Sequence, residues 1–414
     1  MVRTWRALCT LSMATALAGL SLDASISPVA LQAQDQRGPG SGAQWYGECS
    51  PEWAGPPSSP SSDGALKDPS WSLGERGANV VAAWKLTRAR GEGVAIAHPD
   101  TGYLPHPAVT AALVGRGFDY TSRRADAIDT ADEGTLQWPG HGTRTGSVIA
   151  GRLFELPNHV MSGVAPAAGL MPLKIAHRVV LIDQLEYDME QLARAIRAAS
   201  IGDPNFVRQK ADIISMSLGG VQRNAKLEAA LAIAEENNVI VLAAAGNQVP
   251  TRRVVYPARY ANVIAIAASN YDSANWEFSS KGASIAVAAP GQNVWSAKYR
   301  LIEERPRSCI EPSSGTSYAV ATTAGVAALW LSHHRQALSN RAYMDIPKTF
   351  KALASCTARP IKVDDPEAYG GGILDAAALL REPLPERDGP AAGQSPRCVV
   401  ALRAVPPRPL RASR

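Results

Sequence analysis

Short apolar runs alternate with longer amphipathic segments through the middle of the chain. Segments 184–199 and 226–236 repeat apolar residues at the spacing of one helix face, and 77–86, 350–354 and 375–380 are also expected to be helical. The runs rich in Val, Ile and Ala are short and indicate buried strands at 93–97, 170–175, 211–216, 239–245, 263–268 and 285–288. Strands that alternate with helices predict an α/β fold, a three-layer sandwich in which helices flank a mainly parallel, twisted sheet.

One further apolar run, 319–331, shows no polar face. As a helix it must therefore lie inside a large domain. Ser317 falls in its first turn, where backbone N–H groups lack intrahelical partners and carry the positive end of the helix dipole. An oxyanion that forms beside Ser317 would find donors there, as acyl transfer requires. A Gly-Thr-Ser sequence alone is more often a helix N-cap, so partners elsewhere must decide.

The N-terminus has the layout of a secretory signal peptide. Arg3 and Arg6 precede the apolar segment 7–22, and small residues follow it. A bilayer span needs about 20 apolar residues, so this segment is too short for a stable membrane span. We predict a signal peptide at 1–33, with cleavage after Ala33 or, alternatively, after Ala24, and an exported protein, either secreted or periplasmic.

Composition divides the rest of the chain into three parts. We expect an irregular Gly/Pro/Ser-rich extension at 34–70, a folded catalytic domain at 71–381, and a Pro/Arg-rich tail at 382–414 that is irregular for most of its length. Hydrophobic residues make up 46% of the 414 residues, enough for a sizeable core. The net charge of +5 owes much to the arginines of the tail, so it predicts no nucleic-acid partner.

Four cysteines remain once the signal peptide is removed, an even number that suits disulfides in an oxidising compartment. Cys309 and Cys356 lie in the predicted domain, and Cys49 and Cys398 lie in the two extensions. We therefore predict the pairs Cys309–Cys356 and Cys49–Cys398, one of three possible connectivities.

No metal site is predicted. The chain has no Cys-x-x-Cys or His-Glu-x-x-His motif, and the acidic segment around Asp126, Asp129, Asp132 and Glu133 matches no ligand spacing, so we expect a solvated loop there. The chemistry requires no cofactor, and the sequence leaves structural calcium undecided.

A serine nucleophile needs a base within hydrogen-bond reach and a third group that holds the base. His141 lies between two glycines where a loop enters a helix, and Asp100 ends a predicted strand. Gly219 and Asn247 also stand at strand ends, so these segments should meet at the carboxyl edge of the sheet. A pair of catalytic aspartates is unlikely because the triplet Asp100-Thr101-Gly102 occurs only once.

Six spaced motifs together resemble the subtilisin family of serine proteases over about residues 71–380. They are Asp100-Thr101-Gly102, Gly140-His141-Gly142-Thr143, Ser215-Met216-Ser217-Leu218-Gly219-Gly220, Ala244-Ala245-Gly246-Asn247, Tyr256-Pro257 and Gly315-Thr316-Ser317. The resemblance implies an endopeptidase with protein or peptide substrates. It makes Ser317 the nucleophile, His141 the general base and acid, Asp100 its orienting carboxylate, and Asn247 with the Ser317 N–H the oxyanion hole.

The resemblance also implies where a substrate would bind. Ser217, Leu218 and Gly219 should line an extended substrate by strand addition, and Ala244, Ala245 and Gly246 should form the opposite wall of the primary specificity pocket. Val255 stands where the family has a glycine at the base of this pocket, which predicts a preference for small or medium apolar residues. In an alternative alignment Arg252 or Arg253 reaches the pocket and favours acidic residues.

Several positions depart from the family pattern. Ala321 replaces a common proline after the nucleophile, Arg144-Thr145 replaces a His-Val pair, and Pro99, preceded by His98, replaces an apolar residue before the aspartate. Residues 34–70 do not suggest a folded inhibitory prodomain. The rival hypotheses are a sedolisin, which has Glu in place of His141, and a catalytically silent relative that binds peptides through the same cleft.

Overall fold

The computed structural model describes residues 60–129, 140–152, 154–156, 159–177, 185–203, 209–248, 251–302, 305–361, 365–387, 389, 391–406 and 408. All of them belong to one compact unit, Ala43–Arg414. The predicted signal peptide lies outside the described residues. None of the described helices is long and apolar enough to cross a membrane.

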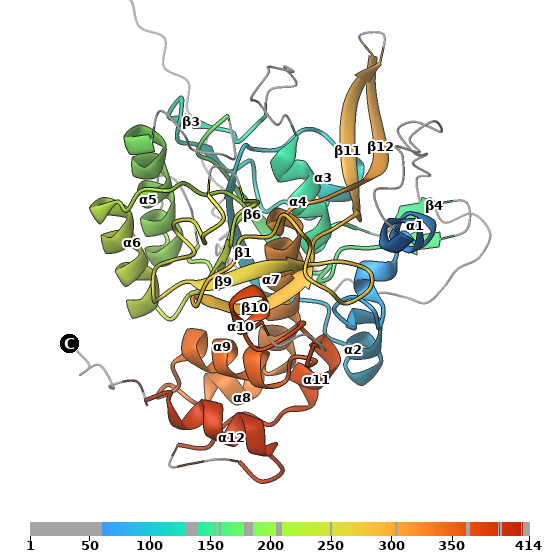
Figure 1. Cartoon of the computed structure of the whole chain (residues 1–414). Helices are drawn as coiled ribbons and strands as arrows, with labels where there is room; N and C mark the ends of the chain where they lie inside the picture. The colour runs from blue at the N-terminus through green and yellow to red at the C-terminus, as the bar shows by residue number, and fades with distance from the viewer. Residues whose placement is uncertain are drawn as a thin grey trace, which may run out of the picture. The chain divides into compact units, whose positions relative to one another are not determined.

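An eight-stranded sheet with the strand order β10-β9-β8-β7-β1-β6-β2-β3 forms the centre of this unit (Figure 1). Its six main strands are parallel to one another and correspond to the six predicted ones: β1 (Ala95–Asp100), β6 (Gly169–Lys174), β7 (Ile213–Met216), β8 (Ile240–Ala244), β9 (Ile264–Ser269) and β10 (Ile285–Pro290). At one edge, β2 (Phe118–Asp119) pairs parallel to β6, and β3 (Arg124–Ala125) pairs antiparallel to β2. The predicted α/β fold is confirmed.

Helices cover both faces of the sheet because successive strand residues point to opposite sides. Helices α5 (Leu185–Ile201) and α6 (Ala225–Glu236) pack in one layer, in a core that includes Ala97 of β1. The adjacent Ile96 belongs to the other core, with α4 (His141–Ala150) and α7 (Thr316–His333). Every residue of α7 from Thr316 to Trp330 is buried, as its lack of a polar face predicted.

The remaining elements surround these three layers. The helices are α1 (Pro60–Lys67), η1 (Trp71–Leu73), α2 (Val80–Leu86), α3 (Pro107–Thr110), α8 (Arg335–Ser339), α9 (Ile346–Cys356), α10 (Pro366–Tyr369), α11 (Ala376–Arg381) and α12 (Pro396–Arg403). Two separate hairpins pair β4 (Phe154–Leu156) with β5 (His159–Met161), and β11 (Val294–Ile302) with β12 (Arg305–Ser313). The hairpin β11–β12 projects from the body of the domain and leads directly into α7 (Figure 1).

Two helices form where the sequence predicts irregular chain. Helix α1 lies within the extension, and the indole of Trp295 donates to the Ala65 carbonyl at 3.2 Å. Helix α12 lies within the tail, where Pro396 takes the first helical position, which needs no N–H partner, and the Ser395 hydroxyl caps the helix. Distant contacts thus stabilise segments whose composition disfavours regular structure.

The predicted cysteine pairing is wrong. Cys356 on α9 is bonded to Cys398 on α12, with a Cα–Cα distance of 5.0 Å. The prediction assumed that the tail stands apart from the domain, whereas α12 packs against α9 and brings Cys398 to Cys356. Cys309 is also disulfide-bonded. Cys49 lies outside the described residues.

Candidate active site

The carboxyl edge of the sheet gathers the predicted catalytic residues. Asp100 is the last residue of β1, His141 the first of α4 and Ser317 the second of α7, while Asn247 follows β8. Parallel strands bring their carboxyl ends to one edge, which places Asp100 and Asn247 there, and the starts of α4 and α7 bring His141 and Ser317 toward them.

Asp100 and His141 form a buried hydrogen-bonded pair. His141 Nδ1 lies 2.8 Å from Asp100 Oδ1 and 3.1 Å from Oδ2, and the two residues are 6% and 1% exposed. Burial by itself raises the pKa of the Asp100 carboxyl, but the His141 ring and the Thr101 N–H more than offset this, so the pKa is lowered. The carboxylate is therefore ionised and holds the Nδ1 proton of His141.

Gly142 allows this close approach. A Cβ at this position would clash with the Gly102 carbonyl and lie 3.3 Å from the Asp100 side chain. Only a glycine therefore lets the first turn of α4 reach the loop that follows β1.

A second buried polar pair joins the same two segments. Asp129 Oδ2 accepts from Thr101 Oγ1 at 2.7 Å and from the Gly140 N–H at 2.8 Å. Lys174 Nζ donates to Asp129 Oδ1 at 3.2 Å and to the Thr101 carbonyl at 2.8 Å. The pair thus ties the loop after Asp100 to the residue before His141.

The expectation that Asp129 lies in a solvated loop is wrong, because it is only 6% exposed. Asp126 forms an ion pair with Arg116, while Asp132 and Glu133 lie outside the described residues. The sequence held one signal for this pair: Lys174 ends an apolar strand, and a buried ammonium group needs a carboxylate partner.

Ser317 is 8% exposed and faces the predicted substrate segment. Its Oγ donates to the Ser217 carbonyl at 3.1 Å, and Ser217 Oγ donates to the Ser317 carbonyl, also at 3.1 Å. These reciprocal bonds fix the start of α7 against the segment that follows β7.

Asn247 is oriented by the residue before the serine. Its Oδ1 accepts from the Thr316 N–H at 3.0 Å and from Thr316 Oγ1 at 2.8 Å. With the oxygen occupied, the Nδ2 group is the free donor, and within the described part of the chain no acceptor pairs with it. An amide that presents its N–H groups beside Ser317 can bind a developing oxyanion.

Val255 lies between the two predicted walls of the specificity pocket. A Cβ placed on Gly219 would be 2.6 Å from Val255 Cγ2, and one placed on Gly246 would be 3.1 Å from Cγ1. Val255 also donates its N–H to the Ala245 carbonyl at 3.0 Å. Arg252 lines a different cavity, of about 540 Å³, together with Gln248 and Lys281.

Comparison with known proteins identifies the family. Residues 91–373 match the model of the subtilase family. The chain belongs to this family. It is 32% identical over 313 residues to an intracellular serine protease of Paenibacillus polymyxa, covering 73% of this chain and 86% of that one. It is also 32% identical over 282 residues to thermitase of Thermoactinomyces vulgaris, covering 67% and 89%.

A protease structure from Pseudoalteromonas arctica superposes on this subtilase with a TM-score of 0.64 at 26% identity, covering 76% of this chain and 96% of that one. The family and these relatives establish that the chain is a serine endopeptidase. Ala321, at the position where the family commonly has proline, is fully buried inside α7.

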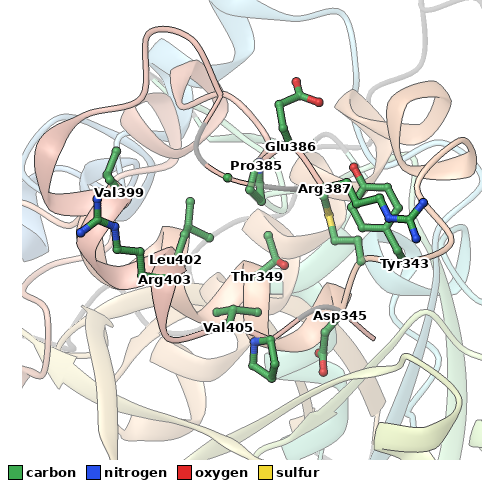
Figure 2. Close-up of a pocket in the computed structure, with 13 residues that line it drawn as sticks. Tyr343, Asp345, Thr349, Pro385, Glu386, Arg387, Val399, Leu402, Arg403 and Val405 are labelled. Atoms are coloured by element: carbon green, nitrogen blue, oxygen red, sulfur yellow. The ribbon is translucent and has the colours of Figure 1, made fainter. Parts of the chain in front are cut away.

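A separate cavity of about 210 Å³ lies in the C-terminal part of this subtilase (Figure 2). It is lined by Tyr343, Asp345, Leu402 and Val405, together with Pro385, Glu386, Arg387 and Gly389. None of the predicted catalytic or substrate-binding residues lines this cavity. Across the described ranges, no three His, Cys, Asp or Glu side chains gather closely enough to hold a metal ion.

Proposed function

We propose that this subtilase is an exported endopeptidase that works through an acyl-enzyme formed on Ser317. The observation that carries the proposal is the buried pair of Asp100 and His141, with 2.8 Å between Oδ1 and Nδ1. An ionised Asp100 holds the proton on Nδ1, so Nε2 is the nitrogen that can accept a proton from the serine.

The chemistry then runs in two halves. His141 Nε2 removes the proton of Ser317 Oγ as the oxygen attacks the scissile carbonyl, and it passes that proton to the leaving amine. Asn247 Nδ2 and the Ser317 N–H stabilise the oxyanion of each tetrahedral intermediate. Water then attacks the acyl-enzyme, while His141 Nε2 accepts a proton from the water and passes it to Ser317 Oγ. In the free enzyme Ser317 Oγ donates to the Ser217 carbonyl, so the hydroxyl must first rotate toward His141.

Substrate recognition is proposed to use backbone pairing. An extended peptide adds to the segment Ser217, Leu218 and Gly219, and Ala244, Ala245 and Gly246 bound the pocket for the residue before the cut. The side chain of Val255, 5% exposed, lies at the base of that pocket and shortens it.

Export is proposed from the N-terminal pattern of 1–33. The disulfide Cys356–Cys398 and the bonded Cys309 support it, because reducing compartments do not usually retain structural disulfides. Sequencing the N-terminus of protein recovered outside the cytoplasm tests the assignment, which falls if residues 1–33 are retained.

The first prediction tests the nucleophile. A fluorophosphonate should label Ser317, and Ser317→Ala should abolish both labelling and peptide hydrolysis while the protein stays folded. Asn247→Asp keeps the acceptor for Thr316 but loses the donor, so turnover should fall by at least about 10²-fold, a magnitude taken from the equivalent amide of a subtilisin. Near-full activity of purified Ser317→Ala would overturn the assignment, and folded protein that takes no label would instead favour a peptide-binding relative.

A further inference from the structure

A second histidine lies behind Asp100. His98 stands two residues earlier on β1, so its side chain leaves the strand on the same face as that of Asp100. It is fully buried, and its Nδ1 is hydrogen-bonded to the Tyr103 hydroxyl. Its Nε2 lies 3.2 Å from Thr145 Oγ1 and 3.6 Å from Asp100 Oδ2.

The Tyr103 hydroxyl determines which nitrogen of His98 carries the proton. Tyr103 is 5% exposed, and its hydroxyl forms no hydrogen bond to any described residue except His98. If the ring donated from Nδ1, the hydroxyl proton would be buried without an acceptor, which is unfavourable. The hydroxyl therefore donates to Nδ1, and the N–H of the ring is at Nε2, where it faces Thr145 and Asp100.

Thr145 connects this ring to the catalytic pair. It lies one turn after His141 on α4, and its Oγ1 is 3.0 Å from the His141 carbonyl and 3.5 Å from Asp100 Oδ2. The valine that the family usually has at this position could make none of these polar contacts.

The His141 ring contacts both oxygens of Asp100, and further polar groups surround the carboxylate. Oδ1 accepts from the His141 ring and, at 2.7 Å, from the Thr101 N–H, while His98 and Thr145 lie on the side of Oδ2. We infer that His98 is a positioning residue: its Nε2–H donates to Thr145 Oγ1 and, at 3.6 Å from Asp100 Oδ2, holds the orientation of the carboxylate by electrostatic attraction. This inference rests on the proposed roles of Asp100 and His141.

Burial keeps His98 neutral despite the nearby Asp100 carboxylate. Burial lowers the pKa of His98 to about 4, with Asp100 raising it and His141 lowering it. Burial also raises the pKa of Tyr103 well above its usual value, so the hydroxyl remains a donor. Across the sheet, His98 pairs with the uncharged Pro172 of β6, and the strand on the other side, β7 (Ile213–Met216), carries no charged residue. His98 therefore acts as a fixed N–H dipole at neutral pH.

Removal of this dipole should change the pH profile as well as the rate. The Nε2–H offsets part of the negative potential that Asp100 exerts on the His141 ring. Without it the carboxylate exerts a stronger negative potential on the catalytic base, so the acid limb of kcat/KM should move to higher pH. We expect His98→Leu to lower kcat by about 10- to 100-fold, the effect of removing one polar neighbour from a buried carboxylate, with little change in KM.

Two variants and a matched control make the test specific. His98→Gln retains an N–H donor, so its kcat should remain within about threefold of the wild-type value and the acid limb of kcat/KM should not move. His98→Met, whose flexible side chain fills irregular space, replaces the leucine variant if that one does not fold. His106→Leu is the control, because His106 is equally buried but bonds to the Cys309 carbonyl, so its loss should leave the acid limb unmoved.

The measurements are kcat, KM and kcat/KM from pH 5 to 10 on a peptide substrate, with fluorophosphonate labelling of each variant. If Ser317 is labelled in the wild type but the pH profiles of His98→Leu and His98→Met superimpose on the wild-type profile, the inference is wrong and the proposed function stands. If Ser317 of folded wild type takes no label, the proposed function fails and the inference fails with it.

Discussion

Single side chains decide what this subtilase does at its carboxyl edge. Thr316 uses two donors to turn the Asn247 amide, and Gly142 makes room for the loop that carries Asp100. In the first case Asn247 Oδ1 is occupied, which leaves Asn247 Nδ2 free to donate. In the second case the absence of a Cβ on Gly142 prevents a clash with the backbone. A conservative substitution of Thr316 should therefore affect catalysis more than folding, whereas any side chain at Gly142 should also strain the backbone.

Val255 should determine which residue is accepted before the cut. Its two methyl groups lie against Gly219 and Gly246, so we expect Ala, Val or Leu to be preferred over Phe, Tyr or Lys. One or two methylenes in an apolar pocket are worth about 1 to 3 kcal/mol, which limits discrimination to about 10- to 200-fold. Profiling on a peptide library measures this preference, and Val255→Gly should shift it toward aromatic residues. If the wild type already prefers aromatic residues and Val255→Gly has the same preference, Val255 does not form the base of the pocket.

At the scale of elements, the junction between β1 and α4 depends on a buried ion pair. Lys174 and Asp129 are 1% and 6% exposed, and together they contact both Thr101 and Gly140. The geometry between Asp100 and His141 is therefore supported by residues that do not themselves touch a substrate.

Breaking this pair on one side should be costly. Lys174→Met leaves the Asp129 carboxylate buried without its cation, which should lower the free energy of unfolding by about 3 to 5 kcal/mol. Urea unfolding in the Ser317→Ala background, which prevents self-digestion, gives this value. Lys174→Met combined with Asp129→Asn removes the buried charge and should recover part of the loss. Equal stability of the single and double variants would contradict this explanation.

The C-terminal helix α12 is fastened to the domain by Cys356–Cys398, whose cysteines are 42 residues apart in sequence. For a loop of that length, chain entropy predicts a stabilisation of about 4 kcal/mol. The double variant Cys356→Ala and Cys398→Ala should lose about this much in urea unfolding. Peptide mapping without reduction checks the pairing, and a Cys309–Cys356 peptide would refute it.

For the whole molecule, buried histidines should make the fold sensitive to acid. Burial lowers the pKa of both His98 and His106 to about 4 from a usual value of 6.5. Between these two values the unfolded chain binds protons that the folded chain does not, so stability is full above pH 6.5 and falls as the pH drops toward 4. The lowered pKa of Asp100 acts in the same direction, because its stabilisation is also lost in acid.

The loss should be on the order of 3 kcal/mol for each histidine by pH 4. Thermal unfolding of Ser317→Ala at pH 7.5 and pH 4.5 measures it, and His106→Gln should show a smaller drop because one buried ring no longer titrates. A melting temperature that does not change between the two pH values would contradict the burial argument.

Local pattern was enough to predict the layers and the edge of the sheet at which Asp100 and His141 meet. Short Val/Ile/Ala runs have few structures open to them other than buried strands, and a helix without a polar face must be surrounded. Because parallel strands place their carboxyl ends together, the ends at Asp100, Gly219 and Asn247 predicted one edge before any contact was known. Asp100 and His141 do meet there.

Other features depended on contacts between distant segments. From the sequence, Asp129 is expected to be one of several solvated acidic residues. In the structure it is paired with Lys174, 45 residues later in the chain. The cysteine pairs could not be derived from the order of parts along the chain, because α12 folds back onto α9. Hydrophobic periodicity records which side of an element is buried but not which partner covers it. The sequence by itself therefore determined the layers and the motif residues, and only the tertiary structure decided which polar groups share a buried space, as His98 does with Asp100.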